Sequence, residues 1–182
     1  MSSTLQITFR LATDEDAVPL EQLINAAFRG DRTMQVFLST DHNSIDVTSV
    51  EKLRAKINHP DCAALLAVSE DGIILAHGSV RKINSSRAWF GMLAVHIEYQ
   101  KRGLGSRVLA HAEEYASRTW DSTTMEFDVV NTRAELIAWY KKRGYKETGT
   151  IIPFPYQYHE GWQAVLRDDL TLVLFAKELE GQ

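Results

Sequence analysis

The chain has 182 residues, of which 45% are hydrophobic and 24% are charged, and its formal net charge is −4 at pH 7. This length and composition are typical of a globular protein with a sizeable core, and we expect residues 1–182 to form a single domain. The negative charge argues against a general nucleic-acid-binding protein, which normally carries a basic excess.

The first part of the chain predicts one strand and two helices. Apolar and polar residues alternate over residues 5–11, which indicates a β-strand. Apolar residues at helical spacing follow, and Asp16 and Gly30 suit the beginning and end of that helix. A second helix is predicted over residues 44–59, because apolar residues recur there at helical spacing and Pro60 comes just after its last turn.

The middle of the chain predicts a hairpin, a longer strand, a helix and another strand. Residues 63–69 and 73–83 are apolar segments on either side of a turn with the sequence EDG, and residues 87–97 indicate a third strand. A helix over 103–120 and a strand over 123–130 follow. A strand–helix–strand unit of this kind places its two strands in parallel through a right-handed crossover.

The last part predicts a helix and two strands around an irregular segment. The helix over 133–144 ends in three cations and a glycine, which suits the negative end of the helix dipole. Strands are predicted near 146–151 and over 170–179. Between residues 150 and 169, prolines, a glycine and several aromatic residues interrupt the pattern. This segment is either a hydrophobic flap over the core or a wall of a substrate pocket.

Two glycines and two cations mark the start of the helix predicted over residues 103–120. The first backbone N–H groups of a helix lack acceptors, and the positive end of the dipole lies there. Gly103 and Gly105 leave this backbone open to an anion, and Lys101 and Arg102 add positive charge. The turn therefore suits a phosphate group, with a solvated basic turn as the alternative.

Two common phosphate-binding motifs are excluded. The chain has no GxxxxGK[ST] sequence, so it has no P-loop. The dinucleotide fingerprint needs a third glycine where this chain has Val108.

A different motif fits the same turn. Residues 100–105, QKRGLG, match the Q/R-x-x-G-x-G/A acyl-CoA signature of the GCN5-related N-acetyltransferase (GNAT) superfamily. The surrounding MLAVHIEYQKRGLGSRVLAHAEEYA and the later ELIAWYKKRGYKETG also resemble segments of that superfamily. The resemblance implies its α/β (α+β) fold, a mixed central sheet of about six to seven strands flanked by about four helices.

The resemblance also implies how acetyl-CoA, the acyl donor, would bind. Backbone amides of residues 100–106 would hold the pyrophosphate, and the preceding strand would separate at a bulge from the next parallel strand to admit the pantetheine arm. Asn131 matches a residue that contacts pantetheine in many members, with a helix-cap or turn role as the alternative. The implied cofactor-binding residues are Leu93, Val95, Gln100, Lys101, Arg102, Gly103, Leu104, Gly105, Ser106 and Asn131.

The catalytic residues are less sharply defined. Tyr140 matches the tyrosine that many members use as a general acid, and packing in the core is its structural alternative. Glu126 and Asp128 share one face of a predicted strand and are candidates for the general base. His77 and the pair His159–Glu160 are further candidates. The six histidines show no metal-ligand spacing, so we expect no metal.

The resemblance implies an N-acetyltransferase that moves acetyl from acetyl-CoA to a primary amine of a small molecule or peptide, by direct attack in a ternary complex. Cys62 has no nucleophile signature around it, which favours direct transfer over a covalent enzyme intermediate. Two alternatives stay open: a sensor that binds acyl-CoA without transferring it, and a transferase that uses a longer acyl-CoA.

The expected cellular compartment is based on targeting and membrane-spanning segments that the sequence does not show. The N-terminal sequence has no apolar signal segment, and the apolar runs are too short to span a membrane. Cys62 is the only cysteine, so no intrachain disulfide is possible and a reducing compartment suits the chain. We expect a cytoplasmic protein, monomeric or homodimeric, without nucleic-acid or membrane partners.

Overall fold

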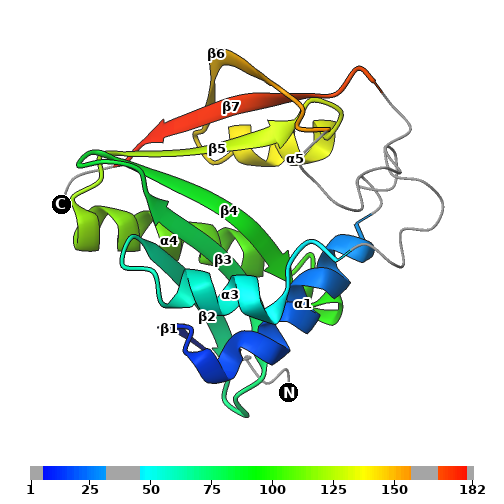
Figure 1. Cartoon of the computed structure of the whole chain (residues 1–182), viewed down its shortest axis with the longest axis vertical. Helices are drawn as coiled ribbons and strands as arrows, with labels where there is room; N and C mark the ends of the chain where they lie inside the picture. Colours follow the sequence, from blue (N-terminus) through cyan, green and yellow to red (C-terminus); the bar gives the residue numbers. More distant parts are fainter. Residues whose placement is uncertain (1–5, 32–45, 157–167, 180–182) are drawn as a thin grey trace.

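The computed structural model describes residues 6–31, 46–156 and 168–179 (Figure 1). Within them, the strands and helices occur in the predicted order. Short 3-10 helices, η1 and η3, cover Asp14–Asp16 and Ile97–Tyr99. The other elements are β1 (Ile7–Leu11), α1 (Ala17–Arg29), α3 (Val50–Ile57), β2 (Cys62–Ser69), β3 (Ile74–Lys82), β4 (Arg87–Val95), α4 (Leu104–Trp120), β5 (Thr124–Val130), α5 (Ala134–Lys141), β6 (Lys146–Pro153) and β7 (Thr171–Glu178).

Helix boundaries near the N-terminus differ from the predicted ones. Helix α3 begins only at Val50, because the Ser49 hydroxyl accepts a hydrogen bond from the Lys52 N–H and caps the helix there. Asp16 precedes α1 as predicted, but its side chain makes no capping hydrogen bond to α1. The carboxylate instead accepts two bonds of 2.7 and 2.8 Å from the Arg10 guanidinium, which lower the pKa of Asp16 to about 2.

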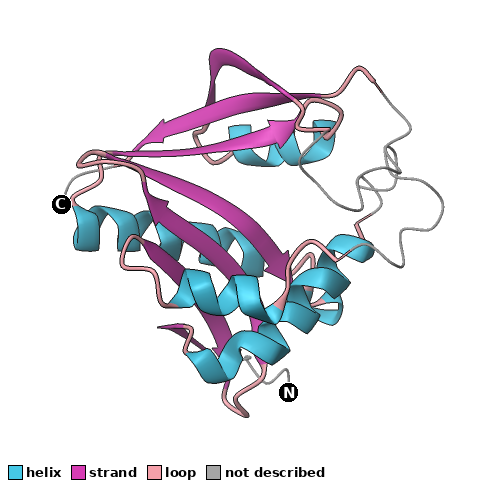
Figure 2. Cartoon of the chain, viewed as in Figure 1, coloured by secondary structure: helices cyan, strands magenta, loops and turns pink. Residues whose placement is uncertain are grey.

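The strands form one mixed sheet in the order β1-β2-β3-β4-β5-β7-β6. Strands β4 and β5 are parallel, as the strand–helix–strand pattern predicts, and the other neighbouring pairs are antiparallel. Figure 2 shows helices on both faces, with α1 and α3 in front of β2 and β3 and with α4 behind them. The architecture is that of the implied fold, which is therefore confirmed.

Buried side chains fill the space between the sheet and the helices on each face. They supply most of the stability, since each fully buried large apolar side chain contributes about 1.5–3 kcal/mol. The group on the α1 and α3 side includes Leu20, Ile24, Leu53, Leu66, Val68 and Ala94. The group on the α4 and α5 side includes Leu109, Ala112, Phe127, Tyr140, Tyr145 and Phe175.

Strands β4 and β5 pair only where they begin. Residues 87–89 pair with 124–126, and beyond Trp89 and Glu126 the two strands diverge (Figure 1). Met92 has a φ of 53°, and the pairing of β4 with β3 shifts register at the same level. These features mark a β-bulge, which bends the strand. The separation at a bulge that the resemblance implied is therefore present.

No helix in these three described segments is long and apolar enough to cross a membrane.

Candidate active site

The glycine-containing turn lies between the end of β4 and the first turn of α4. Lys101 and Gly103 take left-handed backbone conformations, with φ values of 61° and 77°. Helix α4 begins at Leu104, and the Gly103 carbonyl accepts hydrogen bonds from the N–H groups of Ser106 and Arg107 at 3.1 and 3.2 Å. The N–H groups just before these have no acceptor within the helix, so they are free to bind an anion.

The polar side chains of the turn have separate roles. The Gln100 side-chain amide donates to the Val95 carbonyl at 3.2 Å, which ties the turn back to the end of β4. The Arg102 guanidinium lies 5.4 Å from the centre of the Tyr99 ring. Lys101 and Arg102 are both exposed, so their positive charges stay available to a ligand at the turn.

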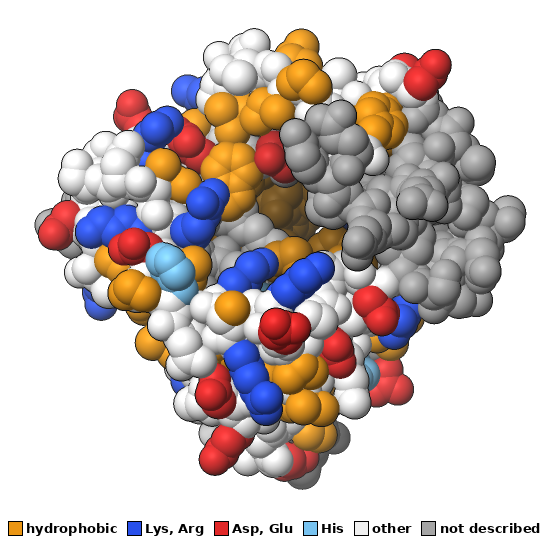
Figure 3. Space-filling model, in the orientation of Figure 1, with side chains coloured by type: hydrophobic (Ala, Val, Ile, Leu, Met, Phe, Trp, Pro, Cys, Tyr) orange, Lys and Arg blue, Asp and Glu red, His pale blue; other side chains and the backbone are white. Residues whose placement is uncertain are grey.

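Gly105 brings the turn together with β4 and α5. A Cβ atom built on Gly105 would lie 3.7 Å from Trp139, 3.7 Å from Val95 and 3.8 Å from Leu93. The structure therefore places three of the predicted cofactor-binding residues at one point, where β4 no longer pairs with β5. Figure 3 shows a recess between the two halves of the sheet, with hydrophobic side chains on its floor.

Tyr140 lies in the core on the α5 side of β5. It is 5% exposed, and its ring centre lies 4.0 Å from that of Phe127. Burial raises the pKa of Tyr140 well above its usual range, and the positive charges of Arg133 and Arg143 oppose this shift. The phenol therefore stays protonated at neutral pH and can donate a hydrogen bond.

The two candidate bases differ in their surroundings. Both lie on the face of β5 opposite Tyr140, since they alternate with Phe127. Glu126 occupies the last position where β5 pairs with β4, and it accepts a hydrogen bond of 3.2 Å from Arg87. Asp128 lies two residues further, where the strands have separated. Burial raises the pKa of Asp128, and no ion pair joins it to any residue in the described segments.

Asn131 connects two strands through its side chain. Its amide nitrogen donates to the Asp169 carbonyl at 3.3 Å, and its amide oxygen accepts from the Thr171 N–H at 3.2 Å. These bonds join the end of β5 to the start of β7. These bonds are what the turn role of Asn131 would need, and its contact with the cofactor stays a prediction.

His77 is fully buried on β3. Its Nδ1 lies 3.2 Å from the Leu65 carbonyl and must donate to it, so Nε2 accepts from the Ser79 hydroxyl at 3.0 Å. Burial lowers the pKa of His77 to about 4, although the bond to Leu65 opposes this shift. Both ring nitrogens are thus committed to the fold. His159 and Glu160 lie outside the described residues.

We expect His77 to make stability depend on pH. Between its ordinary pKa of 6.5 and its folded value of about 4, the unfolded chain binds a proton that the native protein does not bind. The free energy of unfolding should therefore fall by about 3 kcal/mol as the pH drops through this window. Urea titrations at several pH values should show this slope for the parent protein and a smaller one for His77→Asn. Equal slopes would remove His77 as the cause.

Sequence reasoning missed two arginines that flank α5. Arg133, at its start, forms an ion pair with Asp31, just after α1. Arg143, just after its end, lies over the Trp139 ring at 3.6 Å and hydrogen-bonds to Ser106 on α4. The spacing of Trp139 and Arg143, four residues apart on a helix, was the available signal for their contact.

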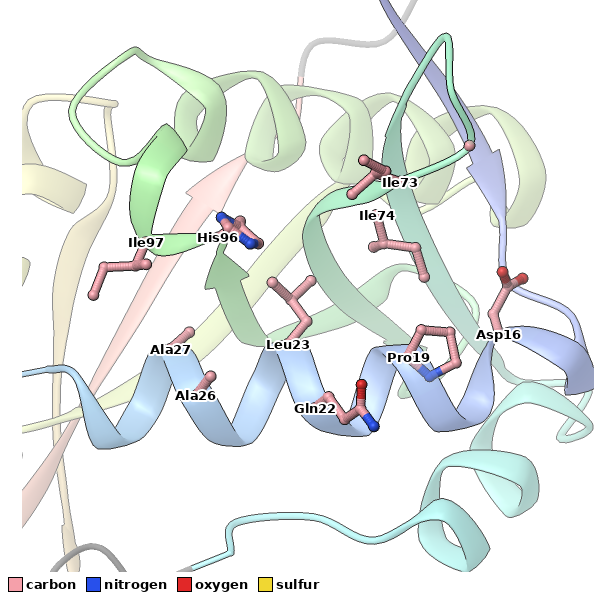
Figure 4. Close-up of a pocket in the computed structure, with 11 residues that line it drawn as sticks. Asp16, Pro19, Gln22, Leu23, Ala26, Ala27, Ile73, Ile74, His96 and Ile97 are labelled. Atoms are coloured by element: carbon pink, nitrogen blue, oxygen red, sulfur yellow. The ribbon is translucent and has the colours of Figure 1, made fainter.

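A separate cavity of about 540 Å³ lies beside α1 (Figure 4). The residues that line it come from η1, α1, the turn before β3 with the first residue of β3, and the segment just after β4. The cavity is lined by Asp16, Pro19, Gln22, Leu23, Ala26, Ala27, Gly72, Ile73, Ile74, His96 and Ile97.

The described segments hold no group of three or more His, Cys, Asp or Glu side chains that could bind a metal.

Comparisons with known proteins agree with this geometry. A family profile described as "Acetyltransferase (GNAT) family" matches residues 21–145. A curated relative, the S-alkylcysteine N-acetyltransferase of Bacillus subtilis (strain 168), is 28% identical over 151 residues, which span 76% of this chain and 78% of the relative.

Solved structures share the fold at low sequence identity. The PaiA N-acetyltransferase from Thermoplasma acidophilum, solved in complex with coenzyme A, superposes with a TM-score of 0.74 at 19% identity, covering 96% of this chain and 99% of that one. The ribosomal-protein-S18-alanine N-acetyltransferase from Escherichia coli has a TM-score of 0.71 at 16% identity, covering 97% and 96%.

Proposed function

The chain belongs to the GNAT acetyltransferase family, and we propose that it transfers the acetyl group of acetyl-CoA to a primary amine of a small molecule or peptide. The observation that carries this proposal is the opening between β4 and β5, which leads to the free N–H groups of α4. Polar backbone on the unpaired edge of β4 can hydrogen-bond an extended arm, and the helix start can hold its phosphates.

We propose the following roles for residues near this opening. The amine nitrogen attacks the thioester carbonyl, and the bond to sulfur breaks as the carbonyl re-forms. Tyr140 is proposed to donate a hydrogen bond to the departing sulfur, because burial keeps its phenol protonated. Asp128 is proposed to take the proton from the amine.

Asp128 fits the base role better than Glu126 for two reasons. It lies past the last β4–β5 pair, whereas Glu126 is still beside the paired segment and is held by Arg87. Burial also raises the pKa of Asp128, which makes its carboxylate a stronger base. The mechanism needs no covalent enzyme intermediate.

The acceptor is proposed to be the α-amine of an amino acid with an apolar side chain. The curated relative is named for S-alkylcysteine, and the hydrophobic floor of the recess in Figure 3 suits an alkyl thioether. The net charge of −4 instead favours cationic amines such as polyamines, which therefore belong in the same test.

Release of free CoA thiol from acetyl-CoA tests the function. We expect thiol and acetylated amine to appear in equal amounts with at least one amine from a panel of S-methylcysteine, polyamines, lysine and peptides. Binding of acetyl-CoA without thiol release across the panel would favour the sensor alternative. A parallel panel of longer acyl-CoA donors tests the acyl chain.

Replacing Asp128 with asparagine should lower kcat/KM about tenfold near pH 7. With a peptide α-amine as the acceptor, the loss is limited because about a tenth of an amine with a pKa near 8 is already unprotonated there. Rates of the variant and the parent should converge above pH 9, where the free amine needs no base. Glu126→Gln is the matched control and should keep the parent's pH profile. A pH-independent loss in Asp128→Asn would contradict the base role.

A further inference from the structure

Arg143 connects the end of α5 to the first turn of α4. Its Nε donates to the Ser106 hydroxyl at 3.1 Å, and one terminal nitrogen donates to the same oxygen. The other terminal nitrogen donates to the Trp139 carbonyl at 2.7 Å. The Trp139 ring lies under the guanidinium at 3.6 Å and also faces Gly105. The guanidinium is thus held in a set plane beside the open start of α4.

No negatively charged side chain of the described residues pairs with Arg143. A positive side chain lies at the positive end of the α4 dipole, an arrangement that is unfavourable unless a negative group joins them. Its acceptors are one neutral hydroxyl and one carbonyl, and within the described segments no carboxylate pairs with it. A guanidinium has five N–H donors in a planar fork that matches phosphate oxygens, so the contacts with Ser106 and Trp139 leave part of that capacity unused.

We propose that Arg143 binds the pyrophosphate of acetyl-CoA, exchanging the Ser106 hydroxyl for phosphate oxygens. The inference rests on the proposed function, because it places the pyrophosphate at the N–H groups of the same α4 turn. Trp139 keeps the guanidinium oriented, so little side-chain freedom is lost when the phosphate binds.

The position of Arg143 gives this contact a second consequence. Arg143 comes just after α5, and α5 follows β5 in the chain. Ser106 belongs to α4, which follows β4. Arg143 therefore bridges the two diverging halves in the free protein. With the donor bound, the same guanidinium would bridge them through the pyrophosphate.

Calorimetry with CoA and with dephospho-CoA, which lacks the 3′-phosphate, tests the proposal. Arg143→Gln should lower the affinity for both ligands equally, because both carry the pyrophosphate. The expected loss is about tenfold to a hundredfold, which is what a hydrogen bond to a charged group contributes. Arg143→Lys should restore part of the affinity, since lysine keeps the charge without the fork. With S-acetylpantetheine as donor, which has no phosphate, kcat/KM should be the same in the parent and Arg143→Gln.

Lys142→Gln is the matched control. It removes the same charge from the neighbouring residue, which is exposed, and should leave both affinities unchanged. Thermal unfolding of each variant checks that the fold is kept. Unchanged CoA affinity in Arg143→Gln would overturn the proposal, as would a loss confined to CoA and absent with dephospho-CoA. If the parent protein itself fails to bind CoA, the proposed function fails instead.

Discussion

Replacing Tyr140 with phenylalanine is expected to lower kcat by about a hundredfold or more, in the range typical of a positioned acid. The KM for acetyl-CoA should change little, because the variant keeps the ring that packs against Phe127 and loses only the hydroxyl. The departing sulfur then has no hydrogen-bond donor from α5. Steady-state kinetics at saturating amine, with thiol release as the readout, measures the effect.

Tyr145→Phe is the matched control for Tyr140. Tyr145 lies in the same cluster of rings, but its hydroxyl donates to Glu113 at 2.9 Å, away from the proposed reaction. Its loss should lower the free energy of unfolding by about 1 kcal/mol and leave kcat close to that of the parent. If Tyr140→Phe keeps full kcat, or if both variants lose activity alike, Tyr140 is only a core residue.

Replacing Gly105 with valine is expected to weaken acetyl-CoA binding by about a hundredfold, or roughly 3 kcal/mol. A Cβ at this position already meets Trp139, Val95 and Leu93 at ordinary contact distances of 3.7–3.8 Å. The two additional methyl groups of valine would therefore fill the space where β4 and α5 face each other. Calorimetric titration with acetyl-CoA measures the loss.

Gly105→Ala separates the steric effect from any change in the helix. The single methyl group of alanine fits the available space. The affinity of Gly105→Ala for acetyl-CoA should therefore stay much closer to the parent's affinity than that of Gly105→Val does. Both variants should remain folded, as judged by circular dichroism. Parent-like affinity in Gly105→Val would mean that the donor does not pass this point.

The order of strands and helices could be predicted because burial patterns are local. The alternation in β1 and the helical spacing in α4 depend only on which residues face the core. Boundaries were less predictable, since they depend on individual hydrogen bonds. Ser49 caps α3 inside the predicted range, and Arg10 draws Asp16 away from capping α1.

The candidate site was also partly visible in the sequence. The two glycines at the start of α4 mark an open helix start by their residue type alone, whatever else surrounds them. The alternation in β5 likewise placed Glu126 and Asp128 on one face. The sequence could not rank these two carboxylates, because their difference depends on where another strand stops pairing.

Local residue patterns therefore predict the elements, the family resemblance and the position of the open turn. Only the tertiary structure separated Asp128 from Glu126, through the bulge at Met92 and the end of pairing at Trp89. It also brought Arg143 to Ser106, although 36 residues lie between them in the chain. Such contacts depend on how whole elements pack, and packing is decided by the sum of many distant side chains rather than by any local pattern.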